Sequence, residues 1–177
     1  MKSRPFVLSI ALLSITLTAF AEETRQKSDE RDKTVKATYL ITGLHCRPCT
    51  KTVESSLQNA KGIHSITVDW KSKEARIEFD EAVLPAQKVA KLIADTPHMM
   101  GRNMHYDGWL ALKVSEVDSD ETAKPVVDFL QKIEGIKRVA AYPKQHSVAL
   151  QFDTKGPVTN AQLIRALAKA GYHVTNL

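Results

Sequence analysis

The sequence contains the same apolar pattern twice, and this internal repeat constrains the fold more than any other feature. A shift of 73 positions superposes the two halves, pairing Val53 with Val126, Leu57 with Leu130, Gly62 with Gly135, Phe79 with Phe152 and Asp80 with Asp153. One extra residue then brings Val89 onto Leu163 and Ile93 onto Leu167. Chance similarity would not hold register through two kinds of periodicity, so the chain carries two copies of one unit.

The first copy has the order strand, helix, strand, strand, helix. Alternation at Tyr39 and Ile41 predicts a strand that runs into a tight loop, and helical spacing after Cys49 predicts a helix that ends near Gly62. Alternating runs over 63–68 and 75–79 predict a hairpin, and an amphipathic helix is expected from about 85 to 95. A last strand is expected near 103–106.

Composition excludes several classes of protein. The 177 residues are 43% hydrophobic and 25% charged, with 7 Gly and 7 Pro, which argues against collagen-like and wholly disordered chains. The net charge is +5, but the basic residues are scattered and only 6% of residues are aromatic, so no nucleic-acid partner is expected. Two cysteines are too few to hold together a small secreted scaffold and enough for one dithiol site.

The amino terminus has the pattern of a secretory signal peptide. Lys2 and Arg4 precede an apolar run over 6–20, and small residues lead to a cleavage site expected after Ala21. Residues 22–36 are polar and mix both signs of charge, which predicts a disordered tail. The two copies are then expected over 37–107 and 108–177.

These segments predict a periplasmic or secreted protein. Cleavage near Ala21 removes Lys2 and Arg4 and lowers the net charge from +5 to +3. No later segment is apolar and long enough to span a bilayer, so direct membrane insertion is not expected after cleavage.

The chemistry of the chain is concentrated in Cys46 and Cys49. The first cysteine lies in a loop and the second in the first helical turn, so both sulfurs point to one place, where free amide N–H groups and the helix dipole favour thiolates. Two soft thiolates suit Cu(I) or Hg(II), and Zn(II) only with more ligands. The second copy has Ser119 and Thr122 at these positions, so it lacks the thiols.

The stretch Gly43-Leu44-His45-Cys46-Arg47-Pro48-Cys49 resembles the loop of the heavy-metal-associated domain. That family includes copper chaperones, modules of copper-transporting ATPases and the periplasmic mercury-binding protein. The resemblance covers residues 37–106, and 109–177 as a copy without the loop. It implies an α+β fold of two tandem ferredoxin-like βαββαβ sandwiches. Leu44 replaces the family's usual Met, a conservative change for a buried apolar residue.

A cluster of soft ligands follows the second expected helix. His98, Met99, Met100 and Met104 lie within eight residues, and His45 adjoins the first cysteine. In a βαββαβ fold this loop lies at the same end of the sheet as the cysteine loop. Thioether and imidazole groups beside thiolates would favour Cu(I) or Ag(I) over Zn(II). We therefore treat all five as candidate ligands, and expect one methionine to fill a gap in the core instead.

The function that these features predict is soft-metal binding without catalysis. An exported Cu(I) chaperone or scavenger would hold the ion between Cys46 and Cys49. It would exchange the ion with a metal-donor or acceptor protein, such as a membrane metal transporter, by ligand exchange. Four alternatives remain: Hg(II) capture in the periplasm, a thiol-disulfide oxidoreductase, an inert structural disulfide, and a docking adaptor with a vestigial loop.

Overall fold

The computed structural model describes residues 34–153 and 156–176. The expected signal peptide, its cleavage site and nearly all of the charged tail lie outside these residues. Within the described ranges, no helix has the length and apolar character needed to cross a membrane.

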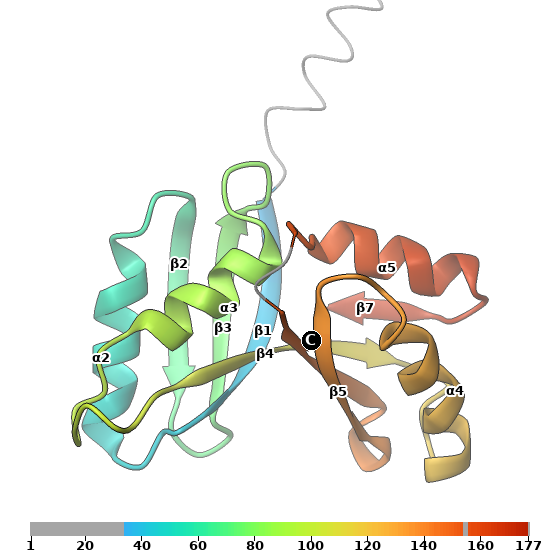
Figure 1. Ribbon diagram of the computed structural model, residues 1–177, viewed down its shortest axis with the longest axis horizontal. Helices are drawn as coiled ribbons and strands as arrows, with labels where there is room; N and C mark the ends of the chain where they lie inside the picture. Colours follow the sequence, from blue (N-terminus) through green and yellow to red (C-terminus); the bar gives the residue numbers. More distant parts are fainter. Residues whose placement is uncertain (1–33, 154–155, 177) are drawn as a thin grey trace, which may run out of the picture. The chain divides into compact units, whose positions relative to one another are not determined.

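The first half of the described chain contains three strands and two helices in the predicted order. The elements are β1 (Thr34–Thr42), α2 (Arg47–Gln58), β2 (Ile63–Asp69), β3 (Glu74–Asp80) and α3 (Ala86–Asp95). β3 lies between β1 and β2 and is antiparallel to both. Figure 1 shows α3 crossing in front of these strands. Pro85 is the N-cap residue of α3, and its carbonyl accepts a hydrogen bond from the Val89 amide at 3.2 Å.

The second half repeats this order at the predicted spacing. Its helix α4 begins 73 residues after α2, and its helix α5 begins 74 residues after α3, so the repeat read from the sequence is confirmed. The elements are β4 (Asp107–Val114), α4 (Asp120–Leu130), β5 (Ile136–Tyr142), the 3-10 turn η1 (Pro143–Gln145), β6 (Ser147–Phe152), α5 (Asn160–Lys169) and β7 (Val174–Asn176).

Strand β4 belongs to both halves. Its residues 107–111 pair with β1, residues 110–113 pair with β6, and residues 112–114 pair with β7. The sheet order is β2-β3-β1-β4-β6-β5, with β7 beside β4. Each half therefore has the antiparallel order of a ferredoxin-like fold, β4-β1-β3-β2 and β7-β4-β6-β5, which confirms the predicted α+β class (Figure 1).

Three expected boundaries differ from the structure. Residues 103–106 do not form the last strand of the first copy, because the first strand of the second copy occupies that place beside β1. The expected division after residue 107 falls at the start of that shared strand. The polar segment expected over 22–36 ends earlier, since β1 begins at Thr34 and Val35 pairs with Phe79.

A single hydrophobic core runs through both halves. Tyr39, Leu110 and Leu150 are cross-strand neighbours on β1, β4 and β6, so their side chains share one face, and all three are fully buried. Residues of α2, α3, α4 and α5 join the same buried cluster. Each small copy therefore shares burial with the other.

Polar contacts also join the halves. Glu81, which is 6% exposed, follows β3, and its carboxylate accepts hydrogen bonds from the amides of Asn160 and Ala161 in the first turn of α5. The side-chain amide of Gln87 donates to the carbonyl of Asp153. A carboxylate of the first half thus caps a helix of the second.

Candidate metal-binding site

Cys46 and Cys49 lie at the start of α2 with their sulfur atoms joined in a disulfide. Cys46 is the N-cap, with φ −140° and ψ 151°, and Cys49 is the third residue of the helix. Their Cα atoms are 5.3 Å apart, Cys49 is fully buried and Cys46 is partly exposed. The two sulfurs therefore meet at one point that solvent reaches from the Cys46 side.

In the second copy, Ser119 and Thr122 occupy the positions of Cys46 and Cys49 and cap the helix that follows. Ser119 Oγ accepts from the Thr122 amide at 3.3 Å, and Thr122 Oγ1 accepts from the Ser119 amide at 3.0 Å, which forms a capping box for α4. Helix α2 has no side-chain cap and no acidic residue in its first turn. Pro48 has no amide N–H and the Cys49 amide donates to the Cys46 carbonyl at 3.1 Å, so on reduction the helix dipole would be what favours thiolate sulfurs there.

Gly43 sets the path of the cysteine loop. Its φ is +86°, a left-handed conformation that glycine adopts without strain. A Cβ atom at this position would lie 2.3 Å from the carbonyl oxygen of His105. The loop after β1 and the loop before β4 therefore pass each other at backbone contact, which brings the predicted cluster to the cysteines.

His98 connects these two loops. Its Nδ1 accepts a hydrogen bond from the Met100 amide at 3.1 Å, so Nε2 carries the proton and donates to the Gly43 carbonyl at 2.9 Å. The ring packs on Tyr106 with centroids 4.5 Å apart. The sequence suggested His98 as a third ligand, but here both nitrogens are bonded to the backbone, so coordination would require one bond to break.

The remaining candidate ligands differ in exposure. Met99 and Met100 are 56% and 58% exposed, and Met104 is half-buried. His45 is exposed, with its ring centroid 5.8 Å from that of His98. Leu44 is buried as expected. In the part of the chain that the structure describes, no group of three or more His, Cys, Asp or Glu residues is placed to hold a metal.

Lys73 is a neighbour of the site that sequence reasoning missed. Its Nζ donates to the Leu44 carbonyl at 3.1 Å and lies 2.8 Å from the centroid of the Trp70 ring. Its own carbonyl accepts from the Ile41 amide at 2.8 Å. The sequence shows only a polar turn at this place, because the contact joins residues 29 positions apart. The turn places a positive charge against the cysteine loop.

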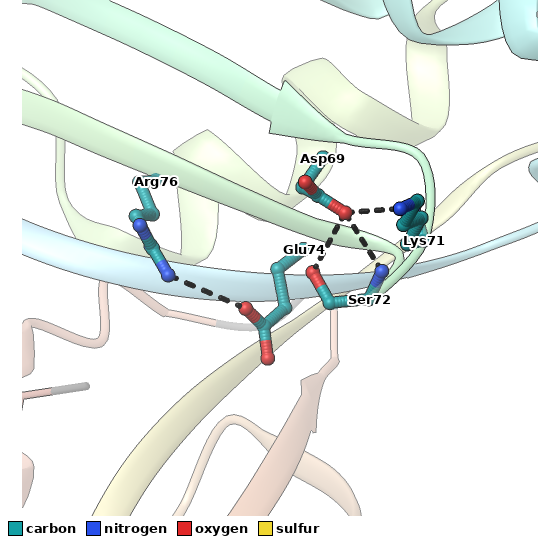
Figure 2. A network of polar contacts seen from close by, with 5 residues as sticks. All are labelled: Asp69, Lys71, Ser72, Glu74 and Arg76. Atoms are coloured by element: carbon teal, nitrogen blue, oxygen red, sulfur yellow. Dashed lines mark hydrogen bonds and ion pairs between the residues drawn. The ribbon is translucent and has the colours of Figure 1, made fainter.

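Asp69 holds the turn that carries Lys73. One carboxylate oxygen accepts from the Lys71 amide at 2.7 Å, from the Ser72 amide at 2.8 Å and from the Ser72 hydroxyl at 3.3 Å (Figure 2). Hydrogen bonds from Ser72 and Lys71 hold the pKa of this exposed carboxyl below its usual value. The ionised form therefore stabilises the folded state.

Asp69→Asn should lower stability near neutral pH, with the difference from wild type shrinking in acid. A depressed carboxyl pKa contributes stability above its unfolded value of about 3.9, and this contribution is lost as the pH falls through the folded pKa. Urea unfolding of both proteins across this range measures the difference. Ser72→Ala, which keeps both amide bonds, should have a smaller effect, and a pH-independent difference would contradict the assignment.

The relatives of this chain have names that refer to copper or mercury transport. The profile of the heavy-metal-associated domain matches residues 38–98. The periplasmic component of the mercuric transport protein of Shigella flexneri is 31% identical over 62 residues, which cover 35% of this chain and 68% of that protein. The chain belongs to the heavy-metal-associated domain family.

Other relatives match both copies. A copper-transporting ATPase of rice (Oryza sativa subsp. japonica, HMA5) is 23% identical over 139 residues, and copper-transporting ATPase 2 of Rattus norvegicus is 24% identical over 140. These matches cover 76% of this heavy-metal-associated chain but only 14% and 9% of the ATPases. Among solved structures, the N-terminal soluble domains of Bacillus subtilis CopA align over 81% of this chain and 93% of theirs, at 16% identity and a TM-score of 0.40.

Proposed function

We propose that the protein binds a soft metal ion between Cys46 and Cys49, with Cu(I) as its main cargo. The observation that carries this proposal is the meeting of both sulfurs at the uncapped start of α2. Two converging thiolates at a helix start, in a loop whose Leu44 carbonyl is bonded to Lys73, form an anionic, soft donor pair suited to Cu(I). The match of both copies to copper-transporting ATPases supports copper as the cargo.

Binding begins with reduction of the disulfide. The bond takes up two electrons and two protons from a dithiol reductant, and the two thiols lose their protons as the metal arrives. Release follows when a sulfur or imidazole of an acceptor displaces one thiolate through a three-coordinate intermediate. The protein acts as a carrier and not as an enzyme, because no bond in a substrate is made or broken.

This metal exchange would take place outside the cytoplasm. Residues 1–21 have the pattern of a secretory signal, and the mercuric relative is named a periplasmic component. The exchange partner would be a metal donor or acceptor protein such as a membrane transporter. The second copy, which has a capping box in place of the thiols, would support the first copy structurally.

Hg(II) is a second candidate cargo because of one specific match. The mercuric transport component is 31% identical over 62 residues, and the family profile matches residues 38–98, which include the cysteine loop. Two thiolates satisfy Hg(II) linearly without further ligands, so the same two residues serve either ion. Ag(I) is a further candidate cargo for the two thiolates. Zn(II) is a weaker one, since it prefers four ligands.

Anaerobic titration with Cu(I) against a chromogenic chelator tests the proposal. The reduced protein should remove one equivalent more of Cu(I) from the chelator than the double variant Cys46→Ser with Cys49→Thr, which should remove none through this site. That variant copies the capping box of Ser119 and Thr122, so α2 should stay folded. Competition with Hg(II) then ranks the two ions.

Two results would contradict the proposal. The first is a reduced protein whose Cu(I) binding equals that of the double variant, which would exclude the sulfurs as ligands. The second is catalytic turnover in an insulin-reduction assay without metal affinity, which would favour a thiol-disulfide oxidoreductase.

A further inference from the structure

Two methionines are presented to solvent beside the cysteine loop. In the described ranges the exposed large hydrophobic residues are Val83, Met99, Met100 and Tyr142. Met99 and Met100 are the most exposed of these, at 56% and 58%. A methionine that fills the core would be buried, as Met104 partly is, so packing does not explain the other two.

A turn holds these two side chains outward. The Gly101 amide donates to the His98 carbonyl at 3.4 Å, which makes Met99 and Met100 the central residues of a four-residue turn. Gly101 has a φ of +137°, and nothing lies within 4 Å of where its Cβ would be. The turn is therefore open to an incoming ligand.

The turn is joined to the cysteine loop by one imidazole. His98 accepts from the Met100 amide through Nδ1 and donates to Gly43 through Nε2. The exposed ring of His45, the residue before Cys46, lies 5.8 Å from the His98 ring. His98 therefore bonds to the backbone of the turn that carries Met99 and Met100, and its ring has the His45 ring as a neighbour.

We propose that Met99, Met100 and His45 form a second soft-metal site for monovalent Cu(I) or Ag(I), which works while the cysteines are closed in a disulfide. Thioether sulfur and imidazole nitrogen are neutral donors that suit Cu(I) and Ag(I). Neither donor is consumed when Cys46 and Cys49 form their disulfide. The site would hold an ion at the mouth of the cysteine loop until reduction opens the thiols.

Ag(I) titration of the full-length protein with its disulfide closed tests the second site. Calorimetry should show one Ag(I) bound per chain, and the methyl NMR signals of Met99 and Met100 should shift while that of Met104 does not. Changing Met99 and Met100 together to Leu should weaken binding by about tenfold or more, because loss of outer-shell partners alone costs that much at metal sites. His45→Gln should also weaken binding, and Met104→Leu should not.

Three results would overturn the second site. They are absence of Ag(I) binding to the disulfide form, an unchanged affinity in the Met99/Met100 or the His45 variant, and a shift confined to the Met104 methyl. The double variant Cys46→Ser with Cys49→Thr should bind Ag(I) as the disulfide form does. This test therefore stands apart from the Cu(I) titration of the thiols, and either site can fail without the other.

Discussion

A chain that ends at Asp107 will not fold, although the internal repeat places the end of the first copy there. Such a chain lacks the rest of β4, which pairs with β1 through residues 107–111. β1 would become an edge strand, and Tyr39 would lose its fully buried neighbour Leu110. Removal of one buried Leu side chain typically costs about 2–5 kcal/mol, and a domain has only about 5–15 kcal/mol of stability.

A chain that ends at Val114 is the matched control. It keeps all of β4 and so restores the four-strand order β4-β1-β3-β2 of the first half. We expect it to be less stable than the full chain, because the side chains of Leu112 and Val114 lose the cover of the second half. Circular dichroism and urea unfolding should show a cooperative transition for this chain and none for the shorter one.

The opposite pattern would contradict a shared strand. If the chain ending at Asp107 unfolds cooperatively with the stability of the longer one, the first copy is complete without β4. The separate last strand expected near 103–106 would then be correct for the isolated copy.

Glu81→Ala should destabilise the protein by about 3 kcal/mol. The buried carboxylate accepts from the amides of Asn160 and Ala161, and hydrogen bonds to a charged group contribute about 1.5–3 kcal/mol each. Thr159 caps only the third amide of α5, that of Gln162, so no other side chain of this helix replaces Glu81. Burial raises the pKa of Tyr39, and the nearby charge of Glu81 raises it further. The Glu81 carboxylate, which is itself buried, thus lies close to the core.

Glu81→Gln is the control that separates charge from shape. It keeps an acceptor oxygen and should lose about half as much stability as the alanine variant. Urea unfolding gives the free energies, and amide hydrogen exchange should speed up at Asn160 and Ala161 more than at the start of α2. Equal protection of these two amides in the wild type and the alanine variant would show that the carboxylate does not cap α5.

Periodicity was enough to predict most of the elements, because each is a local pattern. The helix expected from about 85 to 95 is present as Ala86–Asp95, since its apolar residues recur at helical spacing. The prediction of a last strand in the first copy was wrong because strand pairing depends on residues far apart in the sequence. Residues 103–106 lie where β1 needs a partner in a lone βαββαβ unit, but the first strand of the second copy already fills that place.

The sequence was enough to predict the pair of cysteines in the candidate site, but not the residues that contact the cysteine loop. The spacing of Cys46 and Cys49 at a helix start is visible in the sequence, and their convergence follows from helix geometry. The hydrogen bonds from Lys73 to Leu44 and from His98 to Gly43 join residues far apart in the chain. No local pattern encodes them.

The amino-acid order alone determined that one structural unit occurs twice and that only one copy has thiols, because both statements compare residues at fixed offsets. The tertiary structure decided how the copies combine. Backbone pairing can occupy both edges of a strand, so β4 completes the four-strand order of both halves within one sheet, and a carboxylate from one half caps a helix of the other. These are long-range pairings, which depend on the folded geometry of the whole chain.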